Sequence, residues 1–160
     1  MPEFVLSTHE PVRTDFADLD AFTQGYIEAL FFTEASPAWD KHDIFTDPEG
    51  WEADLEAGTS DGAIPGDAEF GDLSAESLGA IVRDCRIFQR MNEGLLEKAY
   101  ERGYEPVQAG RDYWFTRNGH GVGFWDRTEL DAEGLGDDLS EACRYNEVYV
   151  FWKDAKVYAE

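Results

Sequence analysis

The chain has 160 residues, of which 35 are acidic and 13 are basic, and its formal net charge is -22. Hydrophobic residues make up 42% and aromatic residues 14%, which supplies the core of one packed domain and excludes a disordered acidic tail. The charge also argues against direct binding to DNA, RNA or an anionic membrane, because an acidic surface repels phosphate groups.

The N-terminal part predicts a short strand over 4–7 and an amphipathic helix over 15–33. The helix prediction rests on apolar residues at three-and-four spacing, which places them on one face. These residues are Phe16, Leu19, Phe22, Tyr26, Ile27 and Leu30.

The next stretch, 34–76, holds 13 acids and one base, and prolines and glycines interrupt it repeatedly. Such a composition predicts a long acidic loop, which we expect to form an excursion from the domain and its main interaction surface. The acidic surface residues predicted there are Asp43, Asp47, Glu49, Glu52, Asp54, Glu56, Asp61, Asp67, Glu69 and Asp72.

A second helix is predicted over 74–103, with Ser74 as its N-cap and an apolar stripe that needs a covering partner. Cys85 and Cys143 both lie among apolar residues with helical spacing. We expect two buried thiols, and neither a disulfide nor a zinc site is indicated.

From 111 to 126 the pattern changes to alternation around Asn118-Gly119, which is a strong signal for a two-residue β-hairpin turn. A short helix over 137–145 and a second hairpin over 148–158 follow. The predicted fold is therefore a single α+β domain, 1–160, with an antiparallel sheet of two hairpins packed against two main helices and a long acidic loop excursion. The residues that mark the first hairpin are Arg111, Asp112, Trp114, Arg117, Asn118, His120 and Asp126.

The chemistry of this hairpin can be interpreted in two ways. Arg117, His120 and Asp126 could form the polar centre of a small enzyme, or they could be ordinary turn and surface residues. No histidines or cysteines have the spacing of metal ligands, and no serine or cysteine has the setting of a nucleophile. We therefore predict no catalytic residue, no metal and no cofactor.

The segment from Ala109 to Asp126 resembles a family of small accessory proteins of tailed viruses and plasmids. The likeness extends to 23–34, to 84–88 and to the strand at 148–149, and it covers about half of the chain. The resemblance implies a mobile-element accessory protein, and it implies no particular chemistry. Because the sequence shows neither a signal-peptide pattern nor a membrane span, we expect the protein to work in the cytoplasm of its host, with the virion as the alternative.

Two accounts of the acidity stay open. Carboxylates and few lysines are typical of proteins from cells that accumulate salt, where ions screen the repulsion between like charges. Alternatively, an array of carboxylates imitates nucleic-acid phosphates and binds a basic host defence or DNA-binding protein. The sequence thus favours a non-enzymatic acidic interaction protein with a basic protein partner, with a small enzyme or a halo-adapted virion component as alternatives. The oligomeric state cannot be read from the sequence.

Overall fold

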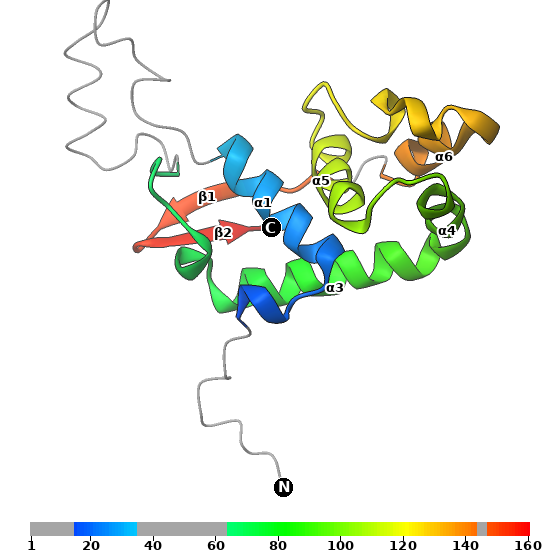
Figure 1. Ribbon diagram of the computed structural model, residues 1–160. Helices are drawn as coiled ribbons and strands as arrows, with labels where there is room; N and C mark the ends of the chain where they lie inside the picture. The colour runs from blue at the N-terminus through cyan, green and yellow to red at the C-terminus, as the bar shows by residue number, and fades with distance from the viewer. Residues whose placement is uncertain (1–14, 35–63, 144–146) are drawn as a thin grey trace, which may run out of the picture.

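The computed structural model of the protein describes residues 15–34, 64–143 and 147–160. Within these ranges, helices and one two-stranded antiparallel sheet form the predicted α+β fold (Figure 1). Short 3-10 turns precede α1 and α3 and connect α5 to α6. The helices and strands are α1 (Ala21–Glu34), α3 (Ala75–Met91), α4 (Glu93–Glu101), α5 (Pro106–Arg117), α6 (Leu135–Glu141), β1 (Val150–Lys153) and β2 (Lys156–Ala159).

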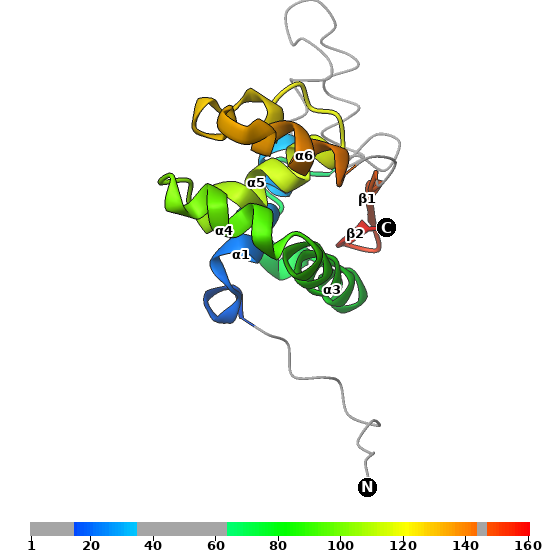
Figure 2. The same ribbon diagram turned by 90° about the vertical axis from the view of Figure 1, so that its right-hand side faces the viewer.

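The tightest helix pair is α1 against α5, and two glycines allow it. A Cβ atom on Gly110 would lie 1.8 Å from the carbonyl oxygen of Phe22, and one on Gly25 would lie 2.0 Å from that of Val107. Only glycine fits where two backbones approach so closely. The crossing brings the buried faces of both helices together over α3, while the hairpin lies at one side of the helices with β2 next to α3 (Figure 2).

The core is largely aromatic, which explains the unusual share of Phe, Tyr and Trp in the sequence. The ring of Phe88 on α3 stacks on Tyr113 of α5 with their centres 4.1 Å apart, and on Phe124 at 5.9 Å. Tyr26 of α1 meets Trp114 edge-on at 5.3 Å. Because these contacts join three helices and the turn after α5, one continuous core holds the described ranges together.

The predicted helix over 74–103 is confirmed at its start and wrong in its length. The hydroxyl of Ser74 accepts a hydrogen bond from the N–H of Ser77 at 3.1 Å, so Ser74 is the N-cap as predicted. The helix breaks at Asn92, whose backbone leaves the helical region and whose side-chain amide donates to the carbonyl of Phe88 at 2.9 Å. The prediction therefore merged two helices, α3 and α4.

The predicted first hairpin, 111–126, is wrong. Residues 106–117 form helix α5, with Pro106 in the first turn, where proline is favoured because it lacks an N–H. Asn118 is the C-cap, and Gly119 follows with φ +65°, the left-handed conformation that ends many helices. Here Asn-Gly stops a helix, and the 120–126 segment is a loop that ends in a 3-10 turn.

The predicted closing hairpin is confirmed, with β1 paired to β2 in the register Val150 to Ala159. Its turn residues, Asp154 and Ala155, both have positive φ, as a two-residue hairpin turn requires. The sheet consists of this hairpin alone in the described ranges, so the predicted sheet of two hairpins is wrong.

The remaining predictions concern the chain ends and the acidic excursion. The first helix begins at Ala21, later than predicted, because a 3-10 turn occupies Phe16–Asp18. The short C-terminal helix exists but spans Leu135–Glu141 instead of 137–145. The predicted strand over 4–7 and most of the acidic excursion lie outside the described residues.

Candidate functional site

Arg117 at the end of α5 is a charged motif residue whose side chain is buried in the fold. Its side chain is 2% exposed, and its Nη1 donates to the Tyr26 hydroxyl at 3.0 Å and lies 3.4 Å from the Asp84 carboxylate. Burial disfavours the charged guanidinium, but the contacts with Tyr26, Tyr113 and Asp84 outweigh that effect and raise the pKa of Arg117. This arginine therefore connects α5 to α1 and α3 inside the core.

Asp112, one turn earlier, is fully buried and is the acceptor for three side chains. Tyr104 donates its hydroxyl to Oδ2, and Gln108 donates to Oδ1 at 3.1 Å. Arg127 donates Nε to Oδ2 at 2.9 Å and Nη2 to Oδ1 at 2.7 Å, a bidentate pair. The hydrogen bonds to Asp112 raise the pKa of Arg127, and burial beside this carboxylate raises that of Tyr104. The cluster fastens the loop after α5 to the helix.

His120 lines a recess of about 360 Å3 between the end of α1, the end of α5 and the start of the hairpin. Its ring stacks on Trp114 with centres 6.0 Å apart, and its Nε2 lies 3.7 Å from a carboxylate oxygen of Glu34. Glu147 and Glu160 also line the recess. An acidic recess with an imidazole suits a cationic group better than an anion.

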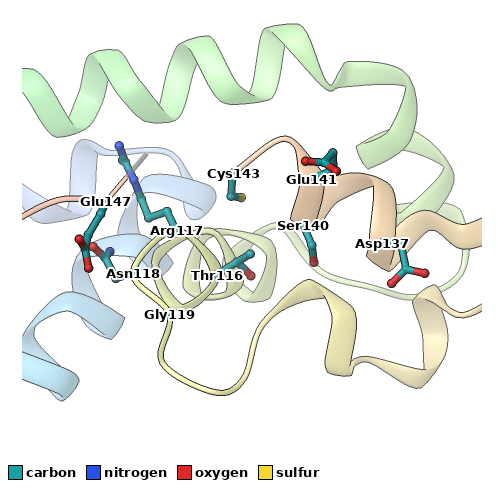
Figure 3. A pocket seen from close by; sticks show the side chains of 9 residues that line it. All are labelled: Thr116, Arg117, Asn118, Gly119, Asp137, Ser140, Glu141, Cys143 and Glu147. Carbon is teal, nitrogen blue, oxygen red and sulfur yellow. The ribbon is translucent and has the colours of Figure 1, made fainter. Parts of the chain in front are cut away.

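A second recess of about 500 Å3 lies on the other side of Asn118, between α5 and α6 (Figure 3). Arg117 and Cys143 lie toward α3 in this view, and α6 contributes Asp137, Ser140 and Glu141. Burial raises the pKa of Cys143 to about 12, so the thiol stays protonated and is a poor nucleophile at neutral pH.

The structure does not bring together the three residues of the alternative enzyme interpretation. Arg117 lines the second recess, His120 lines the first, and Asp126 lies exposed in the 3-10 turn Phe124–Asp126 and lines neither. A catalytic centre needs its groups within hydrogen-bond reach of one reacting atom. The geometry of the described residues thus gives no support to the enzyme interpretation.

The other motif residues have structural partners. Arg111 pairs with Glu28 of α1 at 3.2 Å, and the indole Nε1 of Trp114 donates to Thr33 at 2.8 Å. Asn118 accepts from the backbone N–H of Val148 at 2.8 Å, which ties the hairpin to the end of α5. The motif therefore builds the contact between α1, α5 and the hairpin.

Three of the predicted acidic surface residues lie in the described ranges. Asp67 is exposed. Glu69 is the N-cap of the 3-10 turn Phe70–Asp72 and forms a capping box with Asp72, whose carboxylate accepts from the Glu69 N–H at 3.0 Å. The other predicted acidic residues lie outside the described ranges. These are Asp43, Asp47, Glu49, Glu52, Asp54, Glu56 and Asp61.

A second acidic surface, which the sequence analysis missed, covers residues 126–141 and is called the acidic cap below. It holds seven carboxylates, all exposed, and its one basic residue, Arg127, is engaged by the buried Asp112. Glu133 also forms ion pairs with Lys98 of α4 and with Arg102, the C-cap of that helix. A local count of charge would have found the cap, but the stronger signal of 34–76 obscured it. The carboxylates are Asp126, Glu129, Asp131, Glu133, Asp137, Asp138 and Glu141.

Basic side chains collect elsewhere in the described ranges. Arg83, Arg86 and Arg90 lie on exposed positions of α3, and Lys153 and Lys156 lie at the tip of the hairpin. Figure 1 shows α6 and the hairpin at opposite ends of the molecule, so the acidic cap lies far from the two lysines of the hairpin.

Two further properties bear on ligands. Within the described ranges, no three His, Cys, Asp or Glu side chains are grouped closely enough to hold a metal ion. No helix of the described ranges has the length and apolar character of a membrane span.

No family model matches the chain, and no curated protein and no solved structure is similar to it. The resemblance to viral and plasmid accessory proteins therefore stays a prediction.

Proposed function

We propose that the protein is a non-enzymatic interaction protein that binds a basic protein partner through exposed carboxylates. The observation that supports this proposal best is the acidic cap, where seven exposed carboxylates follow one another within 16 residues and the only base is turned inward to Asp112. A surface of this kind attracts a basic protein over long range and speeds the encounter.

The most specific form of the proposal is nucleic-acid mimicry by a viral or plasmid accessory protein. Carboxylates on a rigid scaffold can occupy the basic groove of a host defence or DNA-binding protein in place of phosphates. The buried side chains of Leu130, Leu135 and Leu139 anchor the cap in the hydrophobic core and supply that rigidity. Adaptation to a salt-accumulating cell is the alternative cause of the acidity.

The proposal is tested by affinity purification of the full chain from a lysate of the native host at about 0.15 M and about 1 M salt. Three chains are compared: the native chain, a cap variant with Asp131→Asn, Asp137→Asn and Asp138→Asn, and a control variant with Glu93→Gln, Glu97→Gln and Glu101→Gln on α4. The two variants have the same net charge. We expect a nucleic-acid-binding protein to be retained at the lower salt by the native chain and the control variant, and lost from the cap variant. Equal retention by all three chains would contradict the proposal.

The dependence of the unfolding free energy on salt distinguishes the two explanations of the acidity. A domain adapted to high salt should lose stability as salt falls from about 1 M to about 0.1 M, where the screening length grows from roughly 3 to 10 Å. We expect the protein to remain folded at the lower salt in chemical denaturation followed by circular dichroism.

A further inference from the structure

The outer edge of strand β1 carries backbone groups with no partner in the described ranges. Tyr149 and Glu160 exchange two backbone hydrogen bonds of 2.8 and 2.9 Å, so the backbone N–H and C=O groups of Tyr149, Phe151 and Lys153 face β2. Because successive residues of a strand direct their backbone N–H and C=O groups to opposite sides, these groups of Val150 and Trp152 point away from β2. No strand of the described ranges lies on that side.

The outer edge of β2 is occupied, in contrast. The carbonyl of Val157 accepts from the N–H of Ser74 at 2.9 Å, and the N–H of Ala159 donates to the Ser77 hydroxyl at 3.0 Å. In both views β2 lies between β1 and α3 (Figures 1 and 2). The hairpin is thus fixed to α3 along β2, whereas β1 is open at Val150 and Trp152, beyond the contact of Val148 with Asn118.

The side chains on the solvent face of the hairpin are aromatic and basic in a protein that is otherwise acidic. The rings of Tyr149, Phe151 and Tyr158 form a row, with centres 5.9 and 5.3 Å apart, and Tyr149 is 67% exposed. Lys153 and Lys156 continue this row at the tip. An open edge beside exposed aromatic rings is a template for another strand.

We propose that β1 pairs antiparallel with β1 of a second copy of this chain, around a two-fold axis at Phe151. The result is a four-stranded sheet in the order β2, β1, β1, β2. We infer a second copy as the partner because, in one antiparallel register, the unpaired backbone groups and the side chains of β1 match those of another β1.

The unpaired backbone groups determine this register. With Phe151 at the axis, Val150 lies opposite the partner's Trp152, and the two symmetric pairs form four hydrogen bonds. Moving the axis to Val150 would place Trp152 opposite the partner's Val148, whose N–H is already donated to Asn118. Moving it to Trp152 would place Val150 opposite a residue of the turn.

The side chains agree with the same register. The two Phe151 rings lie opposite each other in a non-hydrogen-bonded pair, where side chains are closest, and extend the stack with Tyr158. Lys153 lies opposite the partner's Tyr149 and diagonal to the partner's Glu147. Both pairs are favourable, the first between a cation and a ring and the second between opposite charges.

The charge of -22 on each copy opposes this association, so salt should strengthen it by screening the repulsion. A strand from a basic partner would show the opposite salt dependence. The dimer and the proposed binding of a basic partner are therefore independent, and either can fail without the other.

Cysteine cross-linking tests the register directly. In Phe151→Cys the two introduced thiols face each other at the axis, so we expect a disulfide-linked dimer under mild oxidation at about 1 M salt. In the control Tyr149→Cys the same positions of the two copies are offset by four residues, about 13 Å, and cannot be bridged. The native Cys85 and Cys143 are buried and should not compete. Failure of Phe151→Cys to cross-link, or equal cross-linking of both variants, would overturn the proposal.

A charge exchange tests the side-chain contacts by sedimentation equilibrium. We expect Lys153→Glu or Glu147→Lys alone to weaken self-association about tenfold, and the double variant to restore it. Lys156→Glu is the control, because it makes the same charge change on β2, away from the new interface. A native chain that stays monomeric at about 1 M salt, or a control as weak as Lys153→Glu, would show the pairing to be wrong.

Discussion

Asp112 offers the sharpest test of the fold, because the helix and the predicted hairpin place it in different surroundings. In a hairpin it would lie on a face beside Trp114, where removal of a carboxylate costs little. In α5 it is 0% exposed and accepts four hydrogen bonds from Tyr104, Gln108 and Arg127. The substitution Asp112→Ala removes the acceptor and leaves these donors behind.

The expected loss of unfolding free energy follows from the donors that Asp112→Ala leaves without an acceptor. Removing one member of a buried ion pair costs about 3 to 5 kcal/mol, because the other charge stays uncompensated. The Arg127 side chain is 28% exposed and can turn toward water, so the lower end, about 3 kcal/mol, applies. For a chain of this length that corresponds to a fall in melting temperature of roughly 6 to 12 °C.

The assay is urea denaturation followed by far-ultraviolet circular dichroism, on Asp112→Ala, Arg127→Ala and the double variant. We expect the sum of the stability losses of the two single variants to exceed the loss of the double variant by a coupling energy of about 1 to 3 kcal/mol. A loss below about 1 kcal/mol for Asp112→Ala, with additive single effects, would refute the buried network and with it the helical placement.

Three further predictions concern packing, capping and pH. Gly110→Ala should destabilise the protein by about 2 kcal/mol or more in the same denaturation assay, because the added methyl collides with the backbone at Phe22, whereas the open Gly94 should tolerate alanine with no loss. Ser74→Ala should cost about 1 kcal/mol through the lost N-cap, and Ser74→Asp should restore most of it. Burial raises the pKa of Cys143 to about 12 from 9.0, so between these pH values the folded state retains a proton that the unfolded chain releases. The unfolding free energy should therefore fall as the pH rises through this range, and it should fall less steeply in Cys143→Ala. An equal slope in both chains would contradict this cause.

The sequence predicted the closing hairpin and most of the helices because their signals are local. Ser74 is followed by an apolar stripe with helical spacing, and the two-residue turn of the hairpin separates two apolar runs. In each of these elements the buried face is made of apolar residues, so the hydrophobic period equals the structural period.

The same logic failed for α5 because its buried face includes charged residues. The buried positions Ala109, Tyr113, Trp114 and Arg117 follow helical spacing, but Arg117 and the neighbouring Asp112 are polar. When Asp112 and Arg117 are counted as exposed polar residues, the helical spacing of the buried positions is lost and the segment resembles the alternating pattern of a strand. Their burial depends on partners in other elements, which a single sequence does not reveal.

The dipeptide Asn118-Gly119 completed the error. Asparagine and glycine both tolerate positive φ, which is needed in a hairpin turn and also at the end of a helix. The arrangement predicted for the motif residues therefore depended on the secondary structure assigned to them. Once α5 is a helix, Arg117 turns into the core and His120 stacks on Trp114.

The central claim is that the acidic cap binds a basic partner, and a binding titration with the partner recovered from the host tests it most directly. At about 0.15 M salt, we expect the cap variant to bind at least tenfold more weakly than the α4 control variant of equal charge, a difference of about 1.4 kcal/mol. Equal affinities of the two variants would show that only the net charge matters, and the cap would then have no special role.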